Sequence, residues 1–229
     1  MIGLLGTGVN ALAVLIGSSI GFLFKKAIPD RIGKTLMKAL GLCTVIIGIN
    51  GALQGKNTLV MILSMVIGTL IGEALDIDTR VNEGVRKLEK KFSKEGKSQS
   101  LSEGFITSSL LFCIGSMTIV GALNAGLKGD NAMLYTKSLM DFTSSIIFAS
   151  ALGAGVFLSV FFILVYQGGL TLLASLMAPV LSTGVITEMT CVGSLVIIAT
   201  GLNLLEITDL KVLNFIPAMF LPILLCLFM

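Results

Sequence analysis

Five side-chain amides lie within or at the ends of long apolar runs, where polar groups are costly unless they are paired. They are Asn10, Asn50, Asn124, Asn203 and Gln167. Neutral oxygen and N–H groups of this kind can line the path of a solute or an ion. They can also cap helix ends or hydrogen-bond neighbouring helices, which contributes about 1 kcal/mol each. For a single amide the structural interpretation is favoured. For the set Asn50, Asn124 and Asn203 both interpretations stay open.

Two hydroxyls and two carboxylates complete the candidate set. Ser18 and Ser19 lie on the first apolar run, where small residues let the backbone face a cavity. Acidic residues are few and lie near the ends of the apolar runs, which argues against a proton pump built on a central carboxylate. Headgroup water is their favoured environment. Helix tilt can carry only Asp141 or Glu188 inward.

The chain contains no histidine, and this excludes several kinds of chemistry. Ser-His-Asp hydrolases, Cys-His proteases, His-ligated metals and His proton relays all need that side chain. The four cysteines lie in apolar stretches without a CxxC pair, so we interpret them as small buried apolar residues. We expect no catalytic residue, no metal, no cofactor and no enzymatic activity.

The elements that position these side chains are predicted to be membrane helices. Of the 229 residues, 55% are hydrophobic and only 13% are charged, and the mean hydropathy is +0.99. A soluble chain is nearer 25% charged. Several apolar runs reach about 20 residues, enough to cross a hydrocarbon core of about 30 Å. We therefore expect an all-α, polytopic integral membrane protein whose main partner is the lipid bilayer. The basic balance reflects short loops and does not indicate nucleic acid.

The charges at the first loop set the predicted orientation. Five basic residues follow the first apolar run, against the single acid Asp30: Lys25, Lys26, Arg31, Lys34 and Lys38. By the positive-inside rule this loop is cytoplasmic and the N-terminus lies outside. Further spans are expected at residues 40–53, 58–75, 105–127, 185–205 and 212–229, with an outer loop at residues 128–137.

The number of spans depends on residues 142–181, which contain no charge. At about 1.5 Å per residue this stretch makes about 60 Å of helix, or two spans of about 30 Å. Gly153 and Gly155 are the natural turn between two spans. The alternative is one long span to Tyr166 followed by a re-entrant piece from Gln167. We expect seven or eight transmembrane helices and prefer eight, because eight place the Lys- and Arg-free residues 182–188 outside.

Residues 76–103 are the polar part of the chain, with seven Lys or Arg and six Asp or Glu. Apolar residues recur there on one helical face: Ile77, Val81, Val85, Leu88 and Phe92. Such a helix either lies on the anionic cytoplasmic leaflet or packs its apolar stripe on the bundle. The predicted organisation is therefore a three-span membrane repeat (1–75), an amphipathic linker (76–103) and a C-terminal membrane region of four or five spans (104–229).

Parts of the sequence resemble one another. A shift of 74 aligns GLCTVIIGINGALQGKN (41–57) with GSMTIVGALNAGLKGDN (115–131), with six identities in seventeen positions that include Asn50/Asn124 and Asn57/Asn131. GSLVIIATGLNLL (193–205) is a weaker third copy. With eight spans the first three and last three helices would form an inverted-topology repeat, as in many secondary transporters. With seven, the copies would run parallel.

Two GxxxG patterns, Gly17 to Gly21 and Gly68 to Gly72, predict close helix packing. The same small-residue faces are compatible with a homo-oligomer.

Three stretches carry a resemblance to a known family: NALAVLIGSSIGFLFKKAIPDRIGKTLMKALGLCTVIIGINGAL, YQGGLTLLA and ITEMTCVGSLVIIATGLNLLEI. Together they resemble the bacterial membrane-protein family catalogued as domain of unknown function 554, over essentially the whole chain. The resemblance implies a multi-pass protein of the bacterial inner membrane and a candidate transporter. It supplies no catalytic residues.

Two functions follow from these features. The first is a secondary transporter or channel for a small solute or ion, for which Asn50→Ala or Asn203→Ala would remove flux. The second is a non-transporting scaffold or regulatory protein that acts through the amphipathic cytoplasmic helix, for which deletion of residues 77–97 would remove the phenotype.

Overall fold

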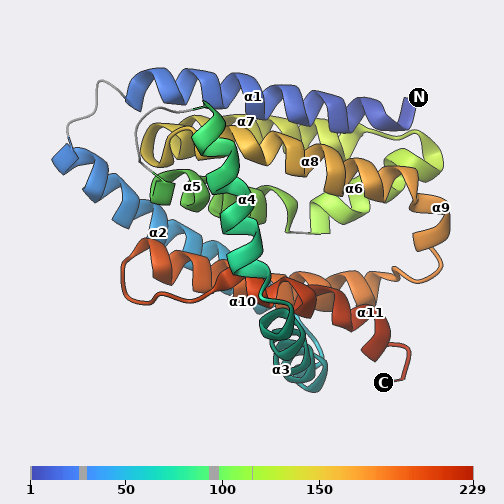
Figure 1. Ribbon diagram of the computed structural model, residues 1–229. Helices are drawn as coiled ribbons and strands as arrows, with labels where there is room; N and C mark the ends of the chain where they lie inside the picture. Colours follow the sequence, from blue (N-terminus) through green and yellow to red (C-terminus); the bar gives the residue numbers. More distant parts are fainter. Residues whose placement is uncertain (1, 26–29, 93–97, 115, 229) are drawn as a thin grey trace. The chain divides into compact units, whose positions relative to one another are not determined.

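Only helices occur among the residues that the computed structural model describes, which are 2–25, 30–92, 98–114 and 116–228 (Figure 1). Lys26 of the basic loop and Gly115 of the internal match lie outside these residues. The all-α prediction is confirmed for the described part. The chain forms two compact units, Met1–Leu36 with Gln99–Pro179, and Met37–Ser98 with Val180–Met229. Each unit is discontinuous in sequence, whereas the predicted organisation divided the chain into three consecutive segments.

Unit 1 is built on three long helices, α1 (Leu5–Lys25), α7 (Ala132–Leu152) and α8 (Gly155–Leu172). The short η1 (Ile2–Leu4) precedes α1, and α9 (Ala174–Met177) follows α8. The pair α5 (Ser98–Cys113) and α6 (Ser116–Lys128) completes the unit.

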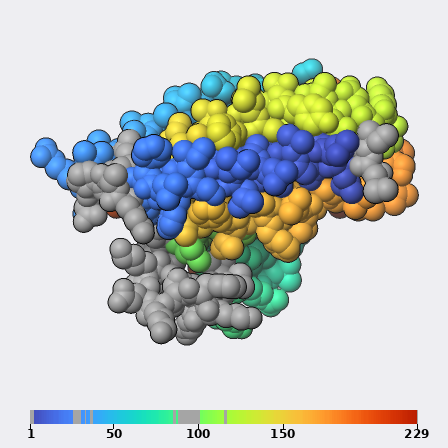
Figure 2. All heavy atoms as spheres, turned by 90° about the horizontal axis from the view of Figure 1, so that it is seen from above, coloured from blue at the N-terminus to red at the C-terminus, as the bar shows by residue number. Residues whose placement is uncertain are grey.

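Contacts along the chain give the directions of the helices in unit 1. Gly6 of α1 meets Asn131 at the start of α7, and Gly21 meets Ile146 further along it, so α1 and α7 run parallel. Helix α8 runs the other way, because Phe22 contacts Phe157 while Thr7 contacts Gln167. Figure 2 shows α1 lying between α7 and α8 on one face of this unit.

Helix α7 begins at Ala132, ten residues before the predicted start of the apolar span at Phe142. The charged residues Lys137 and Asp141 therefore belong to the helix. The expected outer loop at residues 128–137 shrinks to a turn between Lys128 and Ala132, so Lys137 is helical. The predicted turn near Gly153 is confirmed: Gly153 ends α7 with a φ of 81°, a left-handed conformation that glycine adopts without steric cost.

Unit 2 contains most of α2 (Asp30–Ala52), with α3 (Thr58–Leu75) and α4 (Ile77–Phe92). Its second part is α10 (Thr183–Leu204), η2 (Val212–Phe220) and α11 (Leu221–Leu225). Helices α2 and α10 are antiparallel, since Gly41 contacts Gly201 while Gly55 contacts Cys191. The amphipathic prediction for residues 77–92 is confirmed as a helix, and the start of α4 is tied to η2 by a hydrogen bond from the Asp78 N–H to Asn214 Oδ1 (2.8 Å).

Both GxxxG patterns lie at tight helix contacts, as predicted. A Cβ at Gly17 would collide with Ser145 and the Phe142 carbonyl of α7. In unit 2, a Cβ at Gly68 would collide with Ala218, and one at Gly72 with the Asn214 carbonyl. The absence of side chains here lets the backbones approach closely.

Four helices are long and apolar enough to cross a membrane: α1, α3, α8 and α10. The bent pair Leu101–Cys113 and Met117–Lys128, with 60° between its parts, makes a fifth if it counts as one span. Lys38–Ala52 and Val212–Leu225 are shorter apolar helices. By length and composition the described residues thus contain four or five candidate spans, against the seven or eight expected. Many large apolar side chains on these helices face outward, as they must in contact with lipid.

Candidate functional site

The buried face of α1 is made of small and polar residues, the reverse of a soluble helix. It consists of Gly6, Thr7, Asn10, Ala11, Val14, Gly17, Ser18 and Gly21. On the other side of the helix Leu12 is 58% exposed and Leu23 is 74% exposed. The helix therefore presents its apolar side to the surroundings and its polar side to α7 and α8.

A hydrogen-bonded network joins α1 to both partner helices. Asn10 Nδ2 donates to Asp141 Oδ2 on α7 (3.0 Å) and to Gln167 Oε1 on α8 (3.1 Å). Gln167 Nε2 in turn donates to Thr7 Oγ1 on α1 (3.1 Å). Asn10 and Gln167 are 0% exposed and Asp141 is 6% exposed. Three of the residues selected from the sequence thus meet in one place.

Lys137 adds an ion pair to this network. It lies one turn before Asp141 on α7, and its Nζ contacts Asp141 Oδ2. The side chains of the two residues are 8% and 9% exposed. Burial of a charge is expensive unless an opposite charge compensates it, so the pair explains how α7 carries two charges inward. We call Thr7, Asn10, Lys137, Asp141 and Gln167 the polar cluster.

The polar cluster has unused hydrogen-bonding capacity. Asn10 Oδ1 is buried and accepts no hydrogen bond from the described residues. The amide cannot simply be reversed, because its oxygen would then face the Asp141 carboxylate. The Tyr166 hydroxyl on α8 is likewise buried without a partner in the described part of the chain. An unpaired buried polar group costs about 1–3 kcal/mol, and such groups in a native structure point to strain or to a ligand.

The four cysteines differ in their burial. Cys113, at the end of α5, is 1% exposed and lies within electrostatic reach of both Lys137 and Asp141. The prediction that the cysteines are buried holds for Cys113 and Cys191, whereas Cys43 is exposed and Cys226 is half-buried. Among the described residues no group of three or more His, Cys, Asp or Glu side chains is arranged to hold a metal ion.

Ser18 and Ser19 of α1 differ in burial. Ser18 is buried on the same face as Asn10, and its hydroxyl has no partner among the described residues. Ser19 is exposed and donates to the Leu15 carbonyl (2.8 Å).

The three repeat-related amides are not gathered into one network. Asn124 is half-buried on α6 in unit 1, and Asn50 is exposed on α2 in unit 2. Asn203 binds the loop after α10, where it donates to the Leu210 carbonyl (2.8 Å) and accepts from Thr208 (2.7 Å). Because α2 and α10 are antiparallel, Asn50 and Asn203 lie toward opposite ends of that helix pair.

Glu188 performs a local task at the start of α10. Its side chain is buried, and Oε1 accepts the backbone N–H groups of Lys56 (2.7 Å) and Asn57 (3.0 Å). It therefore closes the turn between α2 and α3, although Oε2 is buried without a partner in the described residues.

Lys137 and Thr7 were not among the candidate residues predicted from the sequence. Lys137 was assigned to a loop because the apolar run begins at Phe142. The available signal was the spacing of Lys137 and Asp141, which places opposite charges one turn apart on a helix.

Comparison with known proteins assigns the chain to a family. The family described as "Protein of unknown function (DUF554)" matches residues 5–227. The chain belongs to this family. It is 38% identical over 221 residues to the "Uncharacterized membrane protein YdfK" of Bacillus subtilis (strain 168), covering 95% of this chain and 93% of that protein. It is 33% identical over 220 residues to the "Uncharacterized protein YqgA" of Escherichia coli (strain K12), covering 95% and 94%. No solved structure was found to match. The similarity to YdfK, which is named a membrane protein, and the apolar helices of this chain together indicate a multi-pass membrane protein.

Proposed function

We propose that this protein is a secondary transporter or channel that moves a small solute or ion across the bacterial inner membrane. The observation that carries the proposal is the polar cluster, in which a charged pair and three neutral side chains are buried between α1, α7 and α8. Ionisable residues inside membrane helices are expensive and characteristically mark ion or substrate pathways. The neutral hydrogen-bonding groups around the pair suit recognition of a small polar species.

The proposal includes eight spans with the N-terminus outside. The eight segments are α1, α2, α3, the α5–α6 pair, α7, α8, α10 and the η2–α11 pair. An eight-span chain requires α1 and α7 to run in the same direction and α8 to run in the opposite direction. The contacts within unit 1 agree with these directions. The same topology requires α2 to oppose α10 and α3 to oppose η2, which agrees with the contacts of Gly41, Gly68 and Gly72.

The test is ligand-dependent stability followed by flux. Purified protein in detergent is heated with a panel of ions, amino acids, sugars and organic acids. A ligand that binds only the folded state stabilises it by about 2.7 kcal/mol at one hundred times Kd. A saturable shift in wild type that disappears in Asn10→Ala and persists in Asn50→Ala, the exposed amide, supports the proposal. The second part of the test measures flux of the same ligand into proteoliposomes, which we expect for the wild-type protein.

One combination of results would overturn the transport proposal. A protein that binds nothing in the panel and conducts nothing in proteoliposomes, while the deletion of residues 77–97 removes its cellular phenotype, favours the scaffold function and overturns transport.

A further inference from the structure

Two segments of the chain have helices with the same spacing. Segment A is residues 5–75, from the start of α1 to the end of α3, and segment B is residues 155–225, from the start of α8 to the end of α11. Both bounds differ by 150 positions, as do Pro29 before α2 and Pro179 before α10. We call two positions that differ by 150 counterparts.

In unit 2, α2 of segment A packs antiparallel against its counterpart α10 of segment B. Gly41 contacts Leu205 toward one end of this pair, and Gly55 contacts Cys191 toward the other. The offset of 150 converts position 41 into 191 and position 55 into 205, so each contact is the counterpart of the other. This reciprocity is expected of two similar segments that cross the membrane in opposite directions.

The same relation holds at the centres of the helix pairs in unit 2. Gly48 of α2 contacts Ile198 of α10, and Gly68 of α3 contacts Ala218 of η2. In both contacts the residues are 150 positions apart, so each residue lies on its own counterpart. A Cβ at either glycine would collide with the partner helix, so both pairs are held by close backbone packing.

The third pair of counterparts, α1 and α8 in unit 1, is joined by side chains at both ends. Toward one end Gln167 of α8 accepts a hydrogen bond from Asn10 and donates one to Thr7 (3.1 Å each). Toward the other end the rings of Phe22 and Phe157 pack edge to face, with centroids 5.9 Å apart. Because α1 and α8 are antiparallel, the two contacts lie on opposite sides of the membrane in the proposed topology.

Backbone contacts tie α1 and α8 to different neighbours. A Cβ at Gly17 of α1 would collide with the Phe142 carbonyl of α7, and one at Gly155 of α8 with the Leu101 carbonyl of α5. A Cβ at Gly169 of α8 meets nothing within 4 Å. The contact between α1 and α8 is therefore looser than those of α1 with α7 and of α8 with α5, and it is the interface that can open.

We propose that the two ends of the α1–α8 pair are gates that open alternately, which makes the protein a carrier and not a channel. With the N-terminus outside, the hydrogen bonds of Gln167 to Thr7 and Asn10 close the external gate. The contact of Phe22 with Phe157 closes the cytoplasmic gate. The inference rests on the proposed transport function and topology, and it deepens them by specifying alternating access.

The two gates occupy equivalent positions but use different chemistry. Phe157 is the counterpart of Thr7, and Leu172 is the counterpart of Phe22, so the offset exchanges the cytoplasmic end with the external end. Water can replace the hydrogen bonds of the external gate when it opens. An amide hydrogen bond and an edge-to-face aromatic contact have similar net strengths, so neither gate dominates, as an exchange between two populated states requires.

The experiment measures the distance across each gate with pairs of spin labels. Full-length protein without its native cysteines is purified and placed in lipid nanodiscs. Leu5→Cys with Leu172→Cys carries labels at the external end, and Leu23→Cys with Phe161→Cys carries them at the cytoplasmic end, all at exposed positions. We expect two distance populations at each end, one for the closed and one for the open gate.

Two variants displace this equilibrium in opposite directions. Gln167→Leu removes the external hydrogen bonds, so the ratio of long to short distances should rise about fivefold at the external end and fall by a similar factor at the cytoplasmic end. Phe157→Ala removes the ring contact and should do the opposite. Leu12→Ala is the control, because it removes an apolar side chain of α1 that is 58% exposed, and it should leave both ratios unchanged.

A single fixed distance at each end, in wild type and in both variants, overturns the inference. A change at one end without the reverse change at the other also overturns it, because the gates then do not alternate. Flux of a solute through a protein with fixed distances leaves the transport proposal standing as a channel. Reciprocal distances in a protein that moves no solute of the panel support the two gates and remove the transport proposal.

Discussion

Lys137 and Asp141 form a buried ion pair one helical turn apart on α7, and Asn10 of α1 donates to the same carboxylate oxygen. The hydrogen bond from Asn10 to Asp141 therefore joins α1 to α7, two helices that are far apart in sequence. Its geometry makes the two residues interdependent, because neither charge has another opposite charge in contact within the described residues.

Single and double substitutions test this interdependence. Lys137→Met leaves the Asp141 carboxylate buried without an opposite charge, and we expect it to lower the free energy of unfolding by about 3–5 kcal/mol. The double variant Lys137→Met, Asp141→Leu removes both charges and recovers most of this loss. Chemical unfolding in detergent measures the cycle. Additive losses in the double variant would show that the pair is not coupled.

Close approach of α1 to α7 is expected to depend on Gly17. In Gly17→Val the new side chain collides with Ser145 and the Phe142 carbonyl. Because overpacking costs about 1–3 kcal/mol, we expect a loss of stability of that size and a lower folded yield. Gly8→Val on the same helix is the control, because a Cβ at Gly8 meets nothing within 4 Å. Size-exclusion chromatography and thermal unfolding provide the comparison. Equal tolerance of both substitutions contradicts the tight contact.

A pH dependence is expected at the start of α4. Burial raises the pKa of Asp78, against the opposing effects of its hydrogen bonds and of Lys211. The folded state therefore favours the protonated carboxyl group, whose contribution to stability is complete below the unfolded pKa of about 4 and is lost as the pH rises through the folded pKa.

Asp78→Asn removes that loss. The variant should match wild type at low pH and exceed its stability above the folded pKa of Asp78, most visibly in the unfolding temperature between about pH 4 and 7. Asp130→Asn in the exposed α6–α7 turn is the matched control. A constant offset between Asp78→Asn and wild type at every pH would refute the burial argument.

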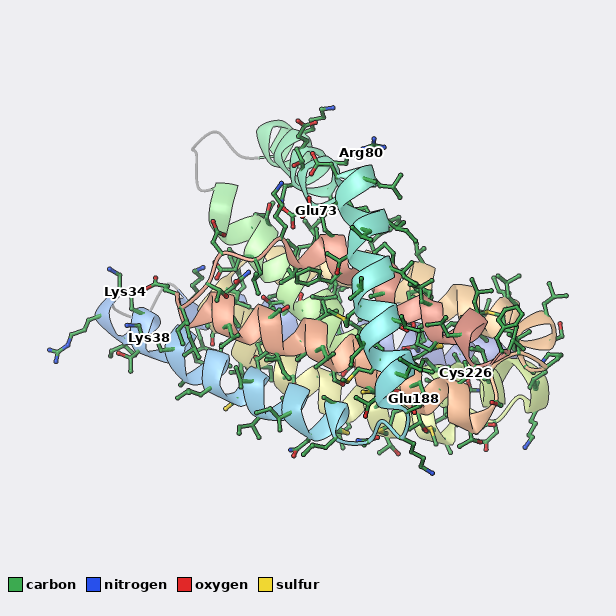
Figure 3. All side chains as sticks on the ribbon, turned by 90° about the horizontal axis from the view of Figure 1, so that it is seen from below. Lys34, Lys38, Glu73, Arg80, Glu188 and Cys226 are labelled. Carbon is green, nitrogen blue, oxygen red and sulfur yellow. The ribbon has the colours of Figure 1, made fainter. Side chains whose placement is uncertain are left out.

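Topology is tested with single cysteines in a background without the four native ones. Lys34 and Lys38 project from the first turns of α2 (Figure 3), and both are exposed. Under the eight-span proposal, Lys34→Cys and Glu83→Cys react with an impermeant maleimide only in opened cells, whereas Lys128→Cys and Gly184→Cys react in intact spheroplasts. Reaction of Lys34→Cys from outside would invert the orientation.

The sequence was sufficient for the helices whose signals are local. The run 58–75 coincides with α3, because Asn57 caps its start with hydrogen bonds to the N–H groups of Leu59 and Val60 and charged residues follow its end. The turn at Gly153 and the amphipathic α4 were also predicted, because their signals likewise lie in the local sequence. Helix α7 was misplaced because apolar character alone does not reveal charges that are paired inside a bundle.

The candidate site could be predicted only in part. Asn10 and Gln167 were selected because polar groups in apolar runs are costly, and Asp141 because helix tilt could carry it inward. Their contact depends on helices far apart in the chain, since Asn10 and Asp141 are separated by 131 positions. Asn203 was selected by the same argument and binds its own loop instead. Sequence gives the cost of a buried amide but not the partner that offsets it.

The discontinuity of unit 1 has a consequence for biosynthesis. Helix α1 ends at Lys25, whereas α7, the helix it lies against, is complete only at Leu152. At about 5–20 residues per second, a ribosome needs on the order of ten seconds to make the intervening chain. During that interval the glycine, serine and asparagine face of α1 has neither α7 nor α8 to cover it. The nascent chain must therefore keep a polar helix surface in the translocation machinery or in lipid until the centre of the protein emerges.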